Sequence, residues 1–213
     1  MKKIIKILII VAILIIISVI IIKVIPKKEQ KIVCIDPGHG GNDVGAVFRD
    51  RYEKDDTLHI AQLIKKYLEE QDIVVITTRD KDKTTSLYER CKIANKKNAD
   101  LFVSIHRNAA EEDGNGIEIW VNSKRRENDI KLAEAILNNL KNTEFQSNRG
   151  IKCGTIKGKN TNYYVLNNTK MPSCLIELGF ITDDKDNELF DKNIEDYAKA
   201  IASGIIEEIK VEN

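Results

Sequence analysis

The 213-residue chain carries 34 Lys and Arg against 33 Asp and Glu, and these charges are unevenly spread. Six of the cations but only one of the acids fall in the first 30 residues, so residues 31–213 hold 28 cations and 32 acids, a net charge of −4. A domain of that charge repels a phosphate backbone, which argues against nucleic acid as a partner. The length suits one domain with a full hydrophobic core.

The N-terminal segment from Ile4 to Ile25 is almost wholly aliphatic, and only Lys6 and Lys23 place charges in it. About twenty apolar residues cross the hydrocarbon core of a bilayer as a helix. We therefore predict an N-terminal transmembrane helix in residues 1–28 and one domain in residues 29–213. A cleaved signal peptide is the alternative, because lysines precede the apolar run. The run is long for a signal peptide, however, and no small-residue cleavage site follows it.

Strand and helix patterns alternate through the rest of the chain. Apolar and β-branched runs predict six strands, at residues 31–36, 73–78, 101–105, 116–121, 163–166 and 173–176. Helical spacing predicts helices over residues 55–68, 87–94, 130–140 and 194–209. This alternation implies an α/β domain with a mostly parallel, twisted sheet of about six strands and helices on both faces. We expect strand 116–121 at a sheet edge and the polar stretch from Asn142 to Asn162 in a surface loop.

Two of the three histidines directly follow predicted strands. His39 lies in a glycine-flanked turn after the first strand, and His106 comes directly after Ile105. Ligands of open α/β sheets collect beyond the carboxyl ends of the strands. Two histidines need a third protein ligand to make a catalytic zinc site. Glu53, expected in the loop before the next helix, is a better candidate than His59, which lies within that helix.

A third strand brings an acid to the same edge. Glu177 lies in the apolar run from Leu175 to Phe180. An unpaired carboxylate costs several kcal/mol to bury, so Glu177 is expected to be paired, metal-bound or at the mouth of a site. Beside a metal-activated water, such a carboxylate can serve as the general base of a hydrolase.

Eight short motifs follow one another along the domain between Lys31 and Ile209. They are Asp36–Gly41, Asp43–Ala46, Glu53-Lys54, Thr78–Asp80, Ala94-Asn95, Ala99-Asp100, Ser104–His106 with Asn108, and Glu177–Phe180. Each motif is weak by itself. In this order they resemble the zinc-dependent N-acetylmuramoyl-L-alanine amidases, which cut bacterial peptidoglycan.

The resemblance implies one Zn²⁺ per domain, held by His39, Glu53 and His106, with Glu177 as the catalytic carboxylate. It implies hydrolysis of the amide between the lactyl group of N-acetylmuramic acid and the L-alanine of the stem peptide. Asn108 is expected to bind substrate. Arg107 departs from the small or apolar residues common at its position, and it either reaches a substrate carboxylate or points to solvent.

Location and partners follow from the same resemblance. Peptidoglycan is the expected partner, so the domain should lie outside the cell, anchored by a single membrane pass or secreted if the N-terminal segment is cleaved. The layout resembles amidases of the spore cortex. The sequence leaves open whether the protein acts in autolysis, sporulation or germination, and whether it needs an activator protein. Two alternatives remain: a zinc carboxypeptidase acting on the stem peptide, and a wall-binding protein without activity. The second is disfavoured because all four site positions are filled.

Overall fold

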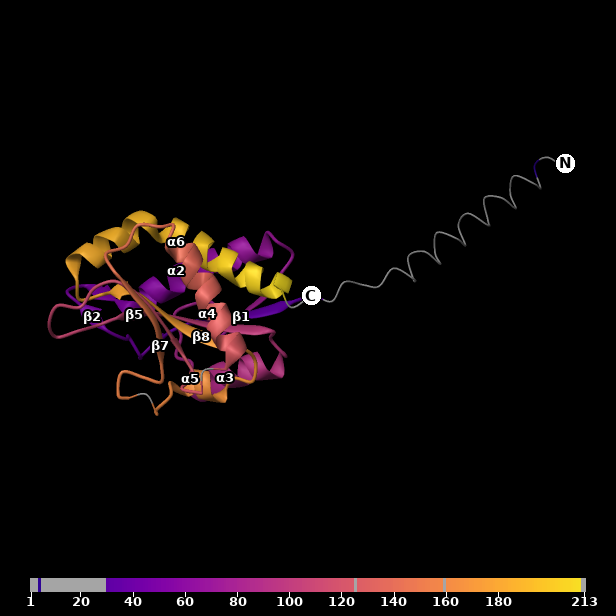
Figure 1. Ribbon diagram of the computed structural model, residues 1–213, viewed down its shortest axis with the longest axis horizontal. Coiled ribbons are helices and arrows are strands. Elements are labelled where there is room, and N and C mark those ends of the chain that lie inside the picture. The colour runs from indigo at the N-terminus through magenta and orange to yellow at the C-terminus, as the bar shows by residue number, and fades with distance from the viewer. Residues whose placement is uncertain (1–3, 5–29, 125, 159, 212–213) are drawn as a thin grey trace. The chain divides into compact units, whose positions relative to one another are not determined.

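The computed structural model describes Ile4 and residues 30–124, 126–158 and 160–211 (Figure 1). Residues Lys31–Asn213 make one compact unit, and every element below belongs to it. Apart from Ile4, the predicted anchor lies outside the described residues. Among the described residues, no helix has both the length and the apolar character needed to cross a bilayer.

The unit is built on a six-stranded sheet with the strand order β4-β1-β5-β8-β6-β7. Four of the five neighbouring pairs are parallel, and only β6 and β8 are antiparallel. The predicted α/β class and mostly parallel sheet are therefore confirmed. The strands are β1 (Ile32–Pro37), β4 (Val74–Thr77), β5 (Leu101–Asn108), β6 (Ile117–Val121), β7 (Asn148–Cys153) and β8 (Ser173–Phe180), and a separate hairpin joins β2 (Val47–Phe48) to β3 (Arg51–Tyr52).

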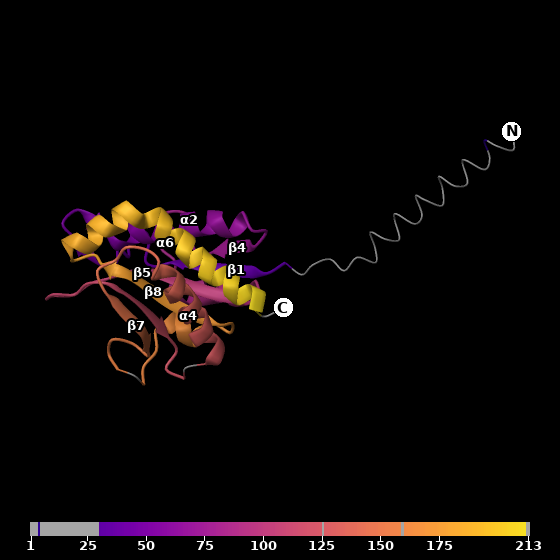
Figure 2. The ribbon, with the colours of Figure 1, turned by 45° about the horizontal axis from the view of Figure 1, so that its top comes forward.

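Helices cover both faces of the sheet, as the sequence predicts. Three long helices share one face in Figures 1 and 2, and two shorter ones lie on the other. The α3 helix begins with a capping box in which Ser86 and Glu89 bind each other's backbone N–H. The first group is α2 (Glu53–Glu69), α4 (Glu127–Leu140) and α6 (Asp184–Val211); the second is α3 (Leu87–Lys96) and α5 (Tyr164–Asn168).

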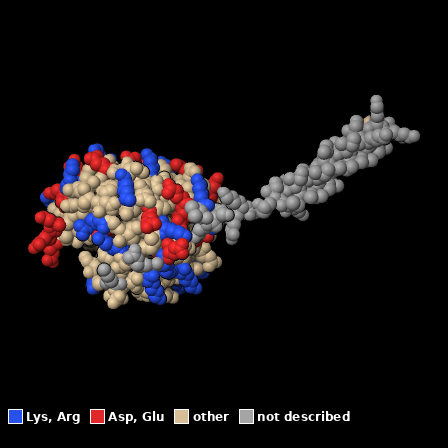
Figure 3. All heavy atoms as spheres, in the orientation of Figure 1, with Lys and Arg blue, Asp and Glu red and all other residues tan. Residues whose placement is uncertain are grey.

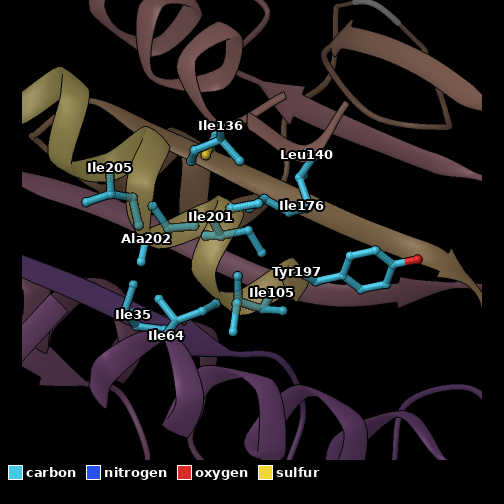
Figure 4. Close-up of a cluster of buried hydrophobic side chains, with 14 of the residues drawn as sticks. Ile35, Ile64, Ile105, Ile136, Leu140, Ile176, Tyr197, Ile201, Ala202 and Ile205 are labelled. Atoms are coloured by element: carbon cyan, nitrogen blue, oxygen red, sulfur yellow. The ribbon is translucent and has the colours of Figure 1, made fainter. Parts of the chain in front are cut away.

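The larger core fills the space between the sheet and the three long helices (Figure 4). Ile105 of β5 and Ile176 of β8 are fully buried there, with Ile201 of α6. Side chains alternate between the two faces of a strand. Burying Ile105 and Ile176 on this face therefore turns the next residues, His106 and Glu177, to the opposite face, where α3 and α5 pack.

Three local predictions are wrong. The run at residues 163–166, predicted as a strand, leads into α5, because an apolar run this short fits either structure and its contacts in the smaller core decide. The expected loop from Asn142 to Asn162 contains β7, whose backbone pairs with β6 despite its polar side chains. Strand β6 lies between β8 and β7, not at the edge.

Candidate active site

The turn after β1 brings two histidines together. His39 has a φ of +61°, in the left-handed region that non-glycine residues seldom adopt. Its carbonyl accepts a hydrogen bond from Arg90 Nη2 at 2.6 Å, and its Nδ1 lies 2.8 Å from Asp43 Oδ1. A Cβ on Gly38 would lie 2.4 Å from the His106 ring, so only glycine fits. The imidazole rings of His39 and His106 consequently meet edge to face, with centroids 4.9 Å apart.

Glu53 lies between these two rings. It is the first residue of α2, not a loop residue as expected, and its side chain is 5% exposed. Its Oε2 is 3.1 Å from His39 Nε2 and its Oε1 is 2.9 Å from His106 Nδ1. The backbone N–H groups of Ala46 and Arg107 donate to the same two oxygens, at 2.9 and 3.0 Å. The carboxylate is therefore fixed in place by four contacts.

This cluster has the composition of a metal site. One donor atom from each of His39, Glu53 and His106 lies within 4.8 Å of the others, whereas His59 is exposed on α2 and outside the group. Burial acts to raise the pKa of Glu53, but hydrogen bonds from His106 and His39 outweigh it and hold that pKa far below its usual range. Two imidazoles around an ionised carboxylate suit Zn²⁺, and Asp43 orients His39 as outer carboxylates commonly do.

Glu177 stands beside the cluster. It lies opposite His106 in the ladder of β8 and β5, is 8% exposed, and has no hydrogen-bond partner for its Oε2 among the described residues. Burial, together with the charges of Glu53 and Glu118, raises the pKa of Glu177 well above its usual value. With both histidines it lines a cavity of about 290 Å³. A carboxylate in this state has a free oxygen and a high proton affinity.

The two expected substrate residues are placed differently. Asn108 is half-buried at the end of β5, where its amide donates to Glu118 Oε1 at 3.0 Å. The expectation for Arg107 is corrected. Its side chain is 1% exposed, binds Asp56 at 2.6 Å and Asn187 at 2.7 Å, and lies over Phe190. Next to His106 along the strand, Arg107 faces the long helices, away from both the cavity and the solvent.

Several motif residues support the backbone of the His39 turn. Asp36 is 1% exposed and accepts hydrogen bonds from Thr78, from Ser104 at 2.8 Å and from Arg90 at 2.8 Å. Arg79 donates to the carbonyls of Pro37 and Gly38, at 3.1 and 2.8 Å. These residues hold the backbone that presents the histidine.

The sequence analysis missed a second group beside Glu177. Glu118 of β6 lies opposite Glu177 and is 3% exposed, and its Oε2 accepts from Arg149 Nε at 2.8 Å. Glu118 also sits in an apolar run, between Ile117 and Ile119, so the argument applied to Glu177 would have found it. Nothing in the sequence marks Arg149, because its partner is 31 residues away.

The comparisons with known proteins agree with this geometry. The family model described as N-acetylmuramoyl-L-alanine amidase matches residues 33–207. The chain belongs to the N-acetylmuramoyl-L-alanine amidase family. A germination-specific N-acetylmuramoyl-L-alanine amidase of Bacillus subtilis (strain 168) is 34% identical over 82% of this chain and 76% of its own length. The uncharacterized protein YqiI of the same strain is 35% identical over 84% of this chain and 82% of its own.

Solved structures give the same result. The N-acetylmuramoyl-L-alanine amidase from Clostridium difficile 630 superposes with a TM-score of 0.79 at 33% identity, over 87% of this chain and all of the other. The CwlD amidase from Clostridioides difficile, solved in complex with the GerS lipoprotein, gives 0.78 at 30% identity, over 85% and 100%. This amidase therefore cleaves the peptidoglycan amide between N-acetylmuramic acid and L-alanine. The predicted family and activity are confirmed, and the carboxypeptidase and inactive-protein alternatives are dropped.

Proposed function

We propose that the amidase works with one Zn²⁺ held by His39, Glu53 and His106, and that Glu177 moves the proton. The observation that carries the proposal is the convergence of three donor atoms within 4.8 Å of one another beside Glu177, whose Oε2 has no partner in the described part of the chain. Two nitrogens and one carboxylate oxygen leave a fourth zinc position open, as catalytic sites require. When bound, the metal supplies the Lewis acid that polarises the lactyl carbonyl.

The side chains then divide the remaining work. Glu177 accepts a proton from the water that attacks the carbonyl carbon, and the C–N bond breaks as Glu177 returns that proton to the alanine nitrogen. The products are a lactyl carboxylate and a free alanine amine. Asp43 keeps His39 in one orientation, and the backbone N–H groups of Ala46 and Arg107 keep Glu53 in place.

Variants of the histidines test the metal assignment. His39→Ala and His106→Ala should lose most bound zinc and with it the activity, because two ligands seldom retain zinc tightly. His59→Ala is the matched control and should keep both. The test measures the zinc content of the purified proteins before chelation, after chelation and after zinc reloading. If His59→Ala strips the metal while Glu53→Ala retains it, the ligand set is wrong.

We propose further that residues 29–213 act outside the cell, attached to the membrane by residues 1–28. The aliphatic run of Ile4–Ile25 supports the anchor, and the cell-wall amidases among the relatives support an extracytoplasmic site of action. The protein should stay in the membrane fraction through high-salt washing. An N-terminal sequence of the mature protein that begins beyond Ile25 would show a cleaved signal peptide instead.

The similarity to a germination-specific relative supports a role at the spore cortex. Loss of the protein should then change muropeptides of the cortex more than those of the vegetative wall. The similar amidase solved with a lipoprotein supports a search for an activator of that kind. Zinc content and rate measured with and without co-expressed candidate lipoproteins would test it.

A further inference from the structure

Two hollows adjoin the Glu177 region on the open side of the sheet, and their chemistry differs. The first is the 290 Å³ cavity above the ends of β1, β5 and β8, with Glu177 in its lining. The second, of about 720 Å³, lies along β6 and β7 and is lined by Asn108, Glu118 and Arg149 among others. We propose that the second hollow receives the stem peptide, with Arg149 binding the α-carboxylate of the peptide's second residue, which is free where that residue is joined to the third through its side-chain carboxyl. This assignment rests on the proposed role of Glu177 at the scissile bond.

The first hollow offers little to a charged ligand. Apart from Glu177, its acids are already paired, Asp36 with Arg90 and Asp43 with His39. The rest of its lining is mainly hydroxyl, aromatic and aliphatic, and includes Thr84, Ser86, Leu87, Tyr163, Tyr164 and Val165. Hydroxyl groups and apolar rings suit a neutral sugar. The N-acetylmuramoyl unit is neutral while its lactyl carboxyl is held in the amide, so this hollow fits the sugar side.

The second hollow has a cation prepared for an anion. The Nε of Arg149 donates to Glu118 Oε2 at 2.8 Å, and the guanidinium lies 5.0 Å from the centroid of the Phe180 ring. Glu118 is fixed in turn by Asn108 Nδ2 at 3.0 Å and Trp120 Nε1 at 2.9 Å. The terminal nitrogens of Arg149 have no hydrogen-bond partner among the described residues, and the side chain is 40% exposed. An oriented guanidinium of this kind matches the geometry of a carboxylate.

The loop between β5 and β6 adds acids to the lining of this hollow. Glu111, Glu112 and Asp113 are exposed in the loop between β5 and β6, which projects at the left of Figure 1, and Figure 3 shows acidic side chains gathered there. A stem peptide carries carboxylates and commonly a side-chain amine at its third residue. A hollow lined by Arg149 and Lys152 together with these acids matches the charges of the peptide, whereas a neutral sugar has no charges to match.

The spacing of the strands sets the distance between Glu177 and Arg149, and this distance decides which residue of the stem peptide Arg149 can bind. Glu177 lies between His106 and Glu118 in the ladder, and β7 is two strands beyond β8, a separation of about 10 Å. Two residues of extended peptide span about 7 Å. The side chain of Arg149 reaches back toward β8 to bind Glu118 of β6, which covers the difference. The second residue, rather than the alanine or a distal residue, is therefore the one within reach.

The experiment compares two synthetic muropeptides that differ only in the second stem residue, with its α-carboxylate either free or amidated. The full-length protein should cleave the free acid with a kcat/KM about tenfold higher, the usual scale of one charge-assisted contact. Arg149→Met should lose that factor, mainly through KM, and treat both substrates alike. Arg149→Lys should restore part of the preference, because it keeps the charge without the fork.

Lys199→Met on α6 is the matched control, since it also removes one cation and lies in an exposed ion pair with Asp196. It should leave both rates unchanged. A sugar-free lactyl peptide should be a poorer substrate but retain the Arg149 effect. Equal rates of the wild type on acid and amide, an equal loss on both in Arg149→Met, or an effect that disappears without the sugar would each overturn the inference. If Glu177→Gln keeps normal turnover while the Arg149 pattern holds, the proposed function fails separately.

Discussion

Two buried carboxylates on this sheet differ in their hydrogen bonding. Asp36, at the end of β1, is 1% exposed and accepts hydrogen bonds from Thr78, Ser104 and Arg90. Glu177, near the end of β8, is 8% exposed, and no described residue binds its Oε2. A buried polar atom without a partner is costly, so folding alone would not favour it. The comparison supports a structural role for Asp36 and the proposed catalytic role for Glu177.

The Glu177→Gln variant gives the largest expected effect and tests whether Glu177, unlike Asp36, takes part in the reaction. The amide keeps the shape of the side chain but cannot accept the proton, so turnover should fall by about 10² to 10⁴. Zinc content and melting temperature should stay near those of the wild type. Amide hydrolysis, metal analysis and thermal unfolding on one preparation make the test. A lower zinc content would make Glu177 a ligand, and a folded, zinc-loaded variant with normal turnover would remove its catalytic role.

Asp36→Asn should give the second-largest effect, this time on stability. Removing the charge leaves the Arg90 guanidinium buried without its counterion, which costs roughly 3–5 kcal/mol. At two to four degrees per kcal/mol, the melting temperature should drop by roughly 6–20 °C. Activity per folded molecule should fall less than in Glu177→Gln. If Asp36→Asn instead stays stable and loses only turnover, Asp36 has a chemical role that the comparison denies.

Thr78→Val should be milder. It removes one of the hydrogen bonds to Asp36 and retains the shape of the side chain, at a cost of about 1 kcal/mol. Denaturant unfolding should show a shift in midpoint without a change in slope. Ser86→Ala at the start of α3 is a useful control, because its loss of a helix cap is of similar size but leaves Asp36 untouched. A Thr78→Val loss as large as that of Asp36→Asn would mean that the three donors act as one unit.

The smallest effect is a change with pH in the melting temperature of the metal-free protein. Burial raises the pKa of Glu177 in the folded state above its value in the unfolded chain. The free energy of unfolding is therefore highest below the unfolded-state pKa, and it falls as pH rises through the folded-state pKa. Glu177→Gln does not titrate there. The melting temperature of the variant minus that of the wild type should therefore increase from pH 4 to pH 8. A constant difference would show that Glu177 gains a partner in solution.

Much of the site was predictable because it depends on local patterns. Strand-forming runs end just before His39 and His106, and Glu177 interrupts another such run, so the parallel sheet that these runs predict brings all three to one edge. Glu53 was also found, although its place on α2 was not. Arg107 was misassigned because alternation along β5 turns it to the face opposite His106, and the residues that cover that face come from distant segments.

The sequence by itself therefore determined the α/β class, the family and the four residues proposed for metal binding and proton transfer, because periodicity and motif order are properties of neighbouring residues. The tertiary structure decided which carboxylates have partners and which do not. It paired Asp36 with Arg90, gave Oε2 of Glu177 no partner among the described residues, and set Arg149 against Glu118 beside the site. Those outcomes depend on which segments meet across the sheet, and hydrogen bonds between residues 31 to 68 positions apart leave no local trace in the chain.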